Sequence, residues 1–264
     1  GAVYFAFQIY GDFSGYSDIA IGTARLFGID LLRNFAYPYF SRDIAEFWRR
    51  WHISLSSWFR DYLYIPLGGS QGGTWMKIRN TIIIFVVSGF WHGAHWTFIA
   101  WGLLHAVYFL PLLLLKKNKD YTGPIALNSF LPSFREGLKM LVTYSLVCFA
   151  WIFFRADNMT EAFSYIQGIF THQFYAPQNF DPPMYYLPFI IILFFLVEWV
   201  CRNHDIEFFF LKFKISGIQE KIKAKINPFN LNVAKKDPSS IPGSVIRLKM
   251  AKSRIFSGFS PIFN

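Results

Sequence analysis

Apolar runs long enough to cross a lipid bilayer recur through most of this 264-residue chain. A membrane-spanning helix needs about 20 mainly apolar residues. Five stretches meet or nearly meet that length: 1–29, 78–92, 93–115, 137–154 and 184–201. In lipid only helices and closed barrels satisfy the backbone, and these runs are continuous rather than alternating. We therefore predict an all-α, polytopic transmembrane protein.

The composition excludes two other classes of protein. Apolar residues make up 53% and aromatic residues 21%, whereas a disordered chain is polar and poor in aromatics. Cys148 and Cys201 are too few for a secreted module held together by disulfides. Because Gly1 is not an initiator methionine and the chain opens inside an apolar stretch, we expect further helices upstream of it.

The basic residues are concentrated at the end of the chain. Residues 1–201 carry 14 Lys and Arg against 12 Asp and Glu, whereas residues 202–264 carry 12 against 4. If the last three apolar stretches each cross the membrane once, this tail and the lysines at 116–119 lie on one side. The positive-inside rule makes that side cytoplasmic. We predict a membrane domain over 1–201 and a basic, poorly ordered cytoplasmic tail over 202–264.

Two segments are predicted to form helices that do not cross the membrane. Residues 35–75 mix apolar and charged residues, and Ser41 followed by an acidic first turn predicts a helix start. The apolar positions at helical spacing are Ile44, Phe47, Trp48, Trp51 and Leu55. This pattern predicts one amphipathic helix, either interfacial or re-entrant between other helices. Asn158 with Glu161 predicts a short capped helix over 159–170.

Four of the six histidines lie in or beside the apolar stretches: His52, His92, His95 and His105. Placing an ionisable side chain at the depth of the bilayer costs free energy, so such a residue is a candidate for a functional role. A histidine at this depth can also join two helices by hydrogen bonding. His92 stands between small residues in Ser88–Gly93, where backbone can approach closely. The spacing of His92 and His95 would suit half of a metal site, but no second cluster accompanies it, and we predict no metal.

Three motifs, in this order, resemble the membrane-bound O-acyltransferases. They are Gly11–Gly22 (GDFSGYSDIAIG), Phe47–Gly69 (FWRRWHISLSSWFRDYLYIPLGG) and Ser88–Gly102 (SGFWHGAHWTFIAWG). Within that family the chain is similar to the alginate O-acetyltransferase branch, a relative of the D-alanyl transfer proteins of teichoic acid. The resemblance covers about residues 1–200. It implies that residues 1–201 are the C-terminal part of a helical membrane domain with a funnel.

The resemblance also implies an activity. The family moves an acyl group from a cytoplasmic thioester donor, such as acetyl-CoA, toward hydroxyls of an extracytoplasmic polysaccharide, such as alginate. It implies the cell inner (plasma) membrane as location, a multi-pass topology, no bound cofactor and contact with membrane lipid rather than nucleic acid. It further implies a separate periplasmic or secreted acyltransferase as a partner. Two histidines match the family's functional positions, His92 in Trp-His-Gly and His52 in Arg-Trp-His.

We assign roles to these residues as hypotheses. His92 is the general base that takes the proton of the attacking hydroxyl, and His52 either donates to the developing oxyanion or orients the acceptor. The remaining candidates are predicted to bind substrate: Arg49, Arg50, Trp91, Asp12 and Asp18. The two arginines suit a donor phosphate, with lipid headgroups as the alternative ligand. The two aspartates form either an internal polar network or part of a substrate path.

Two other functions are compatible with the same sequence. A membrane transporter or channel for acyl groups would use the polar intramembrane residues without catalysis. A lipid-acylating enzyme of the same fold would use the histidines but a lipid acceptor.

Overall fold

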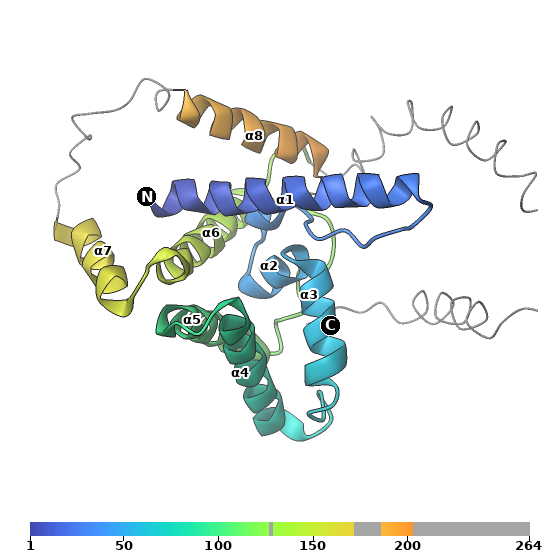
Figure 1. Ribbon diagram of the computed structural model, residues 1–264, viewed down its shortest axis with the longest axis vertical. Coiled ribbons are helices and arrows are strands. Elements are labelled where there is room, and N and C mark those ends of the chain that lie inside the picture. The colour runs from blue at the N-terminus through green and yellow to red at the C-terminus, as the bar shows by residue number, and fades with distance from the viewer. Residues whose placement is uncertain (127–128, 172–185, 203–264) are drawn as a thin grey trace, which may run out of the picture. The chain divides into compact units, whose positions relative to one another are not determined.

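A computed structural model describes residues 1–126, 129–171 and 186–202, and every regular element within them is helical. This confirms the all-α prediction for that part of the chain (Figure 1). The elements are α1 (Ala2–Leu26), η1 (Pro38–Phe40), α2 (Ile44–Arg50), α3 (Ile53–Phe59), η2 (Arg60–Tyr64), α4 (Gly73–His92), α5 (Trp96–Leu114), α6 (Phe134–Arg155), α7 (Met159–Thr171) and α8 (Leu187–Cys201). The tail predicted over 202–264 lies outside the described residues, apart from Arg202.

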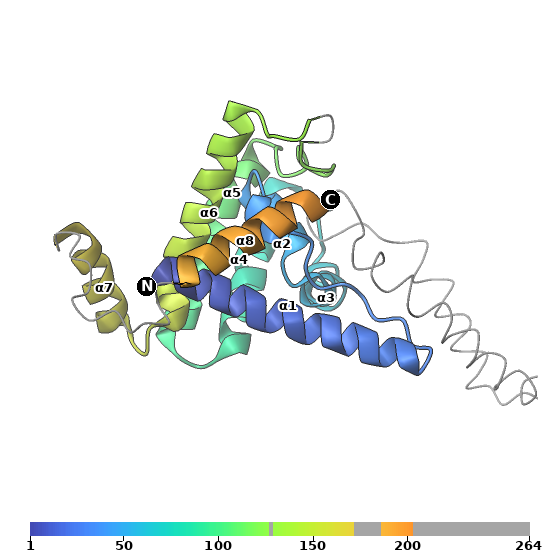
Figure 2. The same cartoon turned by 90° about the horizontal axis from the view of Figure 1, so that it is seen from above.

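Helices α5 and α6 are each long and apolar enough to cross a membrane, by length and composition. Helix α8 is apolar but shorter. Helices α1 and α4 coincide with two more of the predicted stretches, and both carry charged residues, among them Asp12 and Lys77. Helix α8 packs beside α1, where the Tyr10 hydroxyl donates a hydrogen bond of 2.5 Å to the Glu198 carboxylate (Figure 2).

The short capped helix predicted over 159–170 is confirmed. Helix α7 runs from Met159 to Thr171, and the Asn158 side chain accepts a hydrogen bond of 2.9 Å from the backbone N–H of Glu161. The Glu161 carboxylate reaches back to the backbone N–H of Asp157 at 2.9 Å. Both contacts are local in sequence, which is why the residue pattern alone predicted them.

The predicted helix start at Ser41 is wrong by two residues. Asp43 is the N-cap of α2, and its carboxylate accepts a hydrogen bond of 2.6 Å from the backbone N–H of Glu46. The Ser41 hydroxyl instead donates to the carbonyl of Pro38 at 2.6 Å, which closes η1. Serine and aspartate cap helices about equally well, so residue type alone did not separate them.

The single amphipathic helix predicted from this segment is also wrong. The chain leaves the helix after Arg50, passes through an extended Trp51 and a left-handed His52 (φ 46°, ψ 53°), and begins α3 at Ile53. Helix α2 lies inside the helical assembly, because Ile44, Phe47 and Trp48 are all buried. This placement agrees with the re-entrant alternative and not with a helix lying on the surface.

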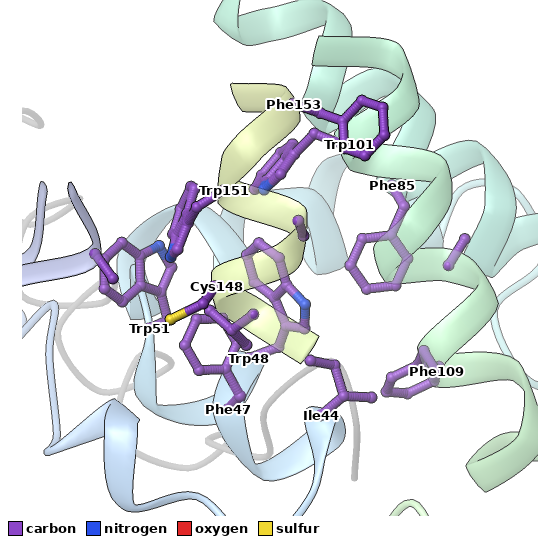
Figure 3. Close-up of a cluster of buried hydrophobic side chains, with 14 of the residues drawn as sticks. Ile44, Phe47, Trp48, Trp51, Phe85, Trp101, Phe109, Cys148, Trp151 and Phe153 are labelled. Carbon is purple, nitrogen blue, oxygen red and sulfur yellow. The ribbon is translucent and has the colours of Figure 1, made fainter. Parts of the chain in front are cut away.

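Aromatic side chains fill the space around α2. Figure 3 shows Trp48 of α2 among the aromatic residues of α4, α5 and α6. The Trp48 ring lies 5.4 Å from Phe85 and 5.8 Å from Trp101, centroid to centroid. The rings of Trp101 and Trp151 stack at 5.7 Å and join α5 to α6. Aromatic contacts of this kind join α2, α4, α5 and α6 within the larger of the two buried clusters in the described part of the chain.

Helices α4 and α5 approach closely because glycine occupies their contact. A Cβ atom on Gly102 would lie 2.2 Å from the carbonyl oxygen of Phe85, and one on Gly89 would lie 2.3 Å from that of Phe98. Such distances are shorter than any real contact, and the obstacle is backbone. Small residues at a helix–helix contact are typical of membrane proteins, where packing drives association.

We expect Gly102→Ala to destabilise the protein by about 1–3 kcal/mol, because the added methyl group forces α4 and α5 apart. Gly22→Ala is the matched control, since a Cβ there meets nothing within 4 Å. Thermal unfolding of the purified full-length protein in detergent measures both. Equal unfolding temperatures for the two variants would contradict the close contact.

Candidate functional site

Two imidazoles that are far apart in the sequence converge on one indole ring. His92 is the last residue of α4, and His52 occupies the break between α2 and α3. The Trp91 ring centroid lies 4.9 Å from that of His92 and 6.4 Å from that of His52. The structure therefore brings together three of the predicted site residues, which come from two different motifs.

His92 is half-buried in a cup of aromatic rings. The centroids of Trp101 and Phe154 lie 5.3 and 5.0 Å from the imidazole, and both present edge-to-face contacts. Phe98 closes a third side at 6.3 Å. Gly93 allows this packing, because a Cβ at that position would lie 2.6 Å from the Phe98 ring. The imidazole is thus neither in open solvent nor sealed from it.

His52 is held in a conformation that few residues adopt. Its φ of 46° lies in the left-handed region, which is uncommon outside glycine. The ring packs edge-on against Phe13 of α1 at 4.6 Å, and its Nδ1 atom is buried without a hydrogen-bond partner in the described part of the chain. Burial, and to a lesser extent the nearby His92, lowers the pKa of His52 to about 4. The ring is therefore neutral at pH 7.

The loop segment from Asn34 to Ala36 fixes the backbone on both sides of His52. The backbone N–H of Ala36 donates to the carbonyl of Arg50 at 2.9 Å, and that of Ile53 donates to the carbonyl of Asn34 at 3.0 Å. The Asn34 side-chain oxygen accepts from the Ser54 N–H at 3.2 Å and from its hydroxyl at 2.5 Å. Asn34 thereby caps α3. We had not singled it out, because its partners lie 20 residues away.

Arg49 and Arg50 direct their guanidinium groups into the protein. Arg49 donates to the carbonyls of Asn118 and Tyr121 at 2.8 and 2.7 Å. Arg50 donates to the carbonyl of Ala36 at 3.0 Å and pairs with the Glu46 carboxylate at 2.9 Å. These contacts tie α2 to its neighbouring loops. Binding of a substrate phosphate by either arginine stays a prediction.

Asp12 and Asp18 lie on an exposed face of α1. The internal polar network expected of them exists on this helix, but other residues form its hydrogen bonds: Tyr10 with Glu198, and Ser17 with Asn34 at 3.4 Å. Asp18 lies close enough to Arg33 and Glu198 for their charges to interact, so the prediction is not overturned for it, and for Asp12 it stays a prediction. The sequence analysis did not single out Glu198. Placing an acid within an apolar stretch such as 184–201 costs free energy in a bilayer, and such a residue is therefore a functional candidate.

The two remaining candidate histidines differ in environment. His95 is exposed, just before α5. His105 is fully buried, and its Nδ1 accepts a hydrogen bond of 3.3 Å from the indole N–H of Trp48. That bond joins α5 to α2, so His105 links helices as the packing alternative supposed.

Comparison with known proteins shows which family and which proteins this chain is similar to. Residues 3–119 match the family model described as MBOAT, membrane-bound O-acyltransferase family. The "Probable alginate O-acetylase AlgI" of Pseudomonas aeruginosa is 43% identical over 171 residues, which cover 65% of this chain and 31% of that protein. The peptidoglycan O-acetyltransferase of Helicobacter pylori is 44% identical over 165 residues, 62% of this chain and 30% of that protein.

A teichoic acid D-alanyltransferase of Streptococcus thermophilus is 43% identical over 115 residues, 40% of this chain and 28% of that protein. The chain spans about a third of the length of the curated relatives that it matches first.

We expect Asn34→Ala to lower the free energy of unfolding by about 0.5–2 kcal/mol, because it leaves the half-buried N–H and hydroxyl donors of Ser54 without this partner. Ser17→Ala is the control, since it removes only the longer contact of 3.4 Å to the same side chain. Thermal unfolding of the full-length protein distinguishes them. A larger loss of stability in Ser17→Ala than in Asn34→Ala would show that Asn34 stabilises α1 rather than α3.

Proposed function

We propose that this chain, whose residues 3–119 belong to the membrane-bound O-acyltransferase family, is part of an enzyme that transfers acyl groups to an extracytoplasmic polysaccharide. The observation that carries the proposal is the convergence of His92 and His52 on Trp91. The names of the relatives support the class of acceptor, since alginate and peptidoglycan are both cell-surface glycans. Acetyl is the acyl group that those names indicate.

In the proposed reaction an acceptor hydroxyl attacks the carbonyl carbon of a thioester such as acetyl-CoA, and the partner acyltransferase later passes the acyl group on to the polymer. A C–O bond forms, the C–S bond breaks, and His92 takes the hydroxyl proton and passes it to the leaving thiolate. General-base catalysis of this kind contributes about 10²–10⁴-fold. The aromatic cup of Trp101, Phe98 and Phe154 keeps water from the thioester, which limits wasteful hydrolysis.

His52 serves the negative oxygen that develops on the acyl carbonyl. A neutral imidazole carries one ring N–H, which is a donor suited to an oxyanion. The low pKa of His52 keeps the ring in that neutral form at pH 7. Orientation of the acceptor hydroxyl is the alternative role for the same N–H group.

In this proposal the ring of Trp91 is the surface on which the acceptor packs. Its side chain is 58% exposed and lies near both imidazoles, so an acceptor packed on it would place a hydroxyl near His92. Arg49 and Arg50 hold α2 in place and thereby position His52. The proposal also includes donor-phosphate binding by these arginines and acceptor binding by Asp12 and Asp18.

The location and partners follow from the same proposal. The protein is a multi-pass component of the inner membrane that receives the acyl group on the cytoplasmic side. A separate periplasmic or secreted acyltransferase completes the transfer to the polymer. The apolar helices α5 and α6 support a membrane location.

An acyl-group transporter without catalysis is the second candidate. The hydrogen bond between Tyr10 and Glu198 favours it, because a paired acid inside apolar helices is typical of transport paths. The two functions differ in their dependence on His92.

We expect His92→Ala in the full-length protein to reduce polymer acetylation by about 10²-fold or more, because the general base is lost. His95→Ala is the matched control: this histidine is three residues away and exposed, and it should retain full activity. Acetyl content of the polymer, normalised to protein level in the membrane, is the measurement. Full acetylation with His92→Ala would exclude catalysis by this imidazole and favour the transporter.

We expect His52→Asn to lower kcat with little change in unfolding temperature, because asparagine tolerates the left-handed backbone that His52 adopts. His52→Gly removes the backbone strain as well and is expected to be equally stable and equally impaired. Steady-state kinetics together with thermal unfolding separate the two effects. Wild-type kcat in both variants would show that His52 acts only in folding.

A further inference from the structure

A cavity of about 300 Å³ lies at the opposite end of α4 and α5 from His92. It opens between the first turns of α4 and the last turns of α5, beside Tyr64 and Ser70. Lys77, which lines it, precedes His92 by 15 residues on the same helix, a separation of about 22 Å at 1.5 Å per residue. The imidazole site therefore does not account for this cavity.

The cavity has an apolar wall and a basic mouth. Its inner lining is formed by side chains of α4 and α5 that face each other: Ile84, Phe85, Phe109 and Leu113. Lys77, Lys116 and Lys119 are among the other lining residues, and no acidic side chain lines the cavity in the described part of the chain. Such a lining suits a ligand that joins a negative group to a hydrocarbon chain.

The backbone at Lys116 forms a common type of helix end. Helix α5 ends with the N–H of Lys116 donating to the carbonyl of Leu113 at 3.2 Å and that of Lys117 donating to Leu112 at 2.8 Å. In this type of helix end the residue after the C-cap, which here is Leu115, adopts a left-handed conformation and is usually glycine. Lys116 adopts it with φ 55°. Glycine would adopt this conformation without strain, so Lys116 offers a substitution that removes the charge and keeps the turn.

We propose that this cavity binds an anionic membrane lipid, with the headgroup phosphate at the three lysines and the first part of an acyl chain against the apolar wall. Lys116 and Lys119 follow the last residues of α5, a helix that is long and apolar enough to cross the membrane, and Lys77 lies beside them near the start of α4. They therefore lie at the level of the headgroups, where basic pockets between helices bind anionic lipids. The apolar wall favours a lipid over a soluble phosphate.

The test uses purified full-length protein in nanodiscs of phosphatidylcholine with increasing phosphatidylglycerol. Native mass spectrometry measures how much phosphatidylglycerol stays bound. We expect Lys77→Gln with Lys119→Gln to weaken retention by about fivefold for each lysine, equivalent to about 1 kcal/mol per charge near the membrane surface. Lys117→Gln is the matched control, because Lys117 lies between two lining residues without lining the cavity, and it should bind like wild type.

Lys116→Gly separates lipid binding from folding. Glycine relieves the left-handed conformation, so the unfolding temperature should not fall, whereas phosphatidylglycerol retention should fall. Unchanged retention in this variant and in the double variant would overturn the proposal, as would equal retention of phosphatidylcholine.

Two soluble competitors identify the source of the phosphate. A lipid site predicts that neither inorganic phosphate nor coenzyme A displaces phosphatidylglycerol. Displacement by coenzyme A, together with a raised donor KM in the double variant, would assign the cavity to the acyl donor and overturn the lipid proposal. The lipid measurement does not depend on acyl transfer, so it stands or falls separately from the proposed enzyme activity.

Discussion

Neutralisation of one buried carboxylate allows α2 to lie at the centre of this protein. The Glu46 side chain is 1% exposed, and Arg42 and Arg50 each pair with it at 2.9 Å. A buried charge without partners costs several kcal/mol, whereas here both carboxylate oxygens are occupied. With the charge compensated, the aromatic face of α2 reaches the core. Trp48 and Trp51 then contact α5 and α6, and the chain arrives at His52 in the position the site requires.

The site depends on two close approaches of backbone. At one, Gly89 and Gly102 let α4 and α5 touch, which places Phe98 and Trp101 beside His92. At the other, the segment 34–36 pairs with the chain on both sides of His52 and turns the imidazole toward Trp91. Each approach involves residues that are distant in sequence. The positions of the two imidazoles are thus set by packing and not by the motifs that contain them.

The two ends of the helix pair α4–α5 have different chemistry. His92 and its aromatic cup occupy one end, and the three lysines with the cavity occupy the other. The buried His105, bonded to Trp48, lies among the aromatic rings between them. An anionic lipid held at the basic end would anchor the pair at the membrane surface.

The sequence by itself determined the helical membrane class, the helix α7 with its cap, and the identity of the candidate histidines. Hydrophobic run length, capping contacts three residues apart and motif order are properties of neighbouring residues, and they need no knowledge of the fold. Only the tertiary structure decided the break at His52, the helix start at Asp43 and the exposed position of Asp12 and Asp18. Those depend on hydrogen bonds and packing between residues far apart in the chain, among them the bond from Ile53 to Asn34, and no local pattern encodes such partners.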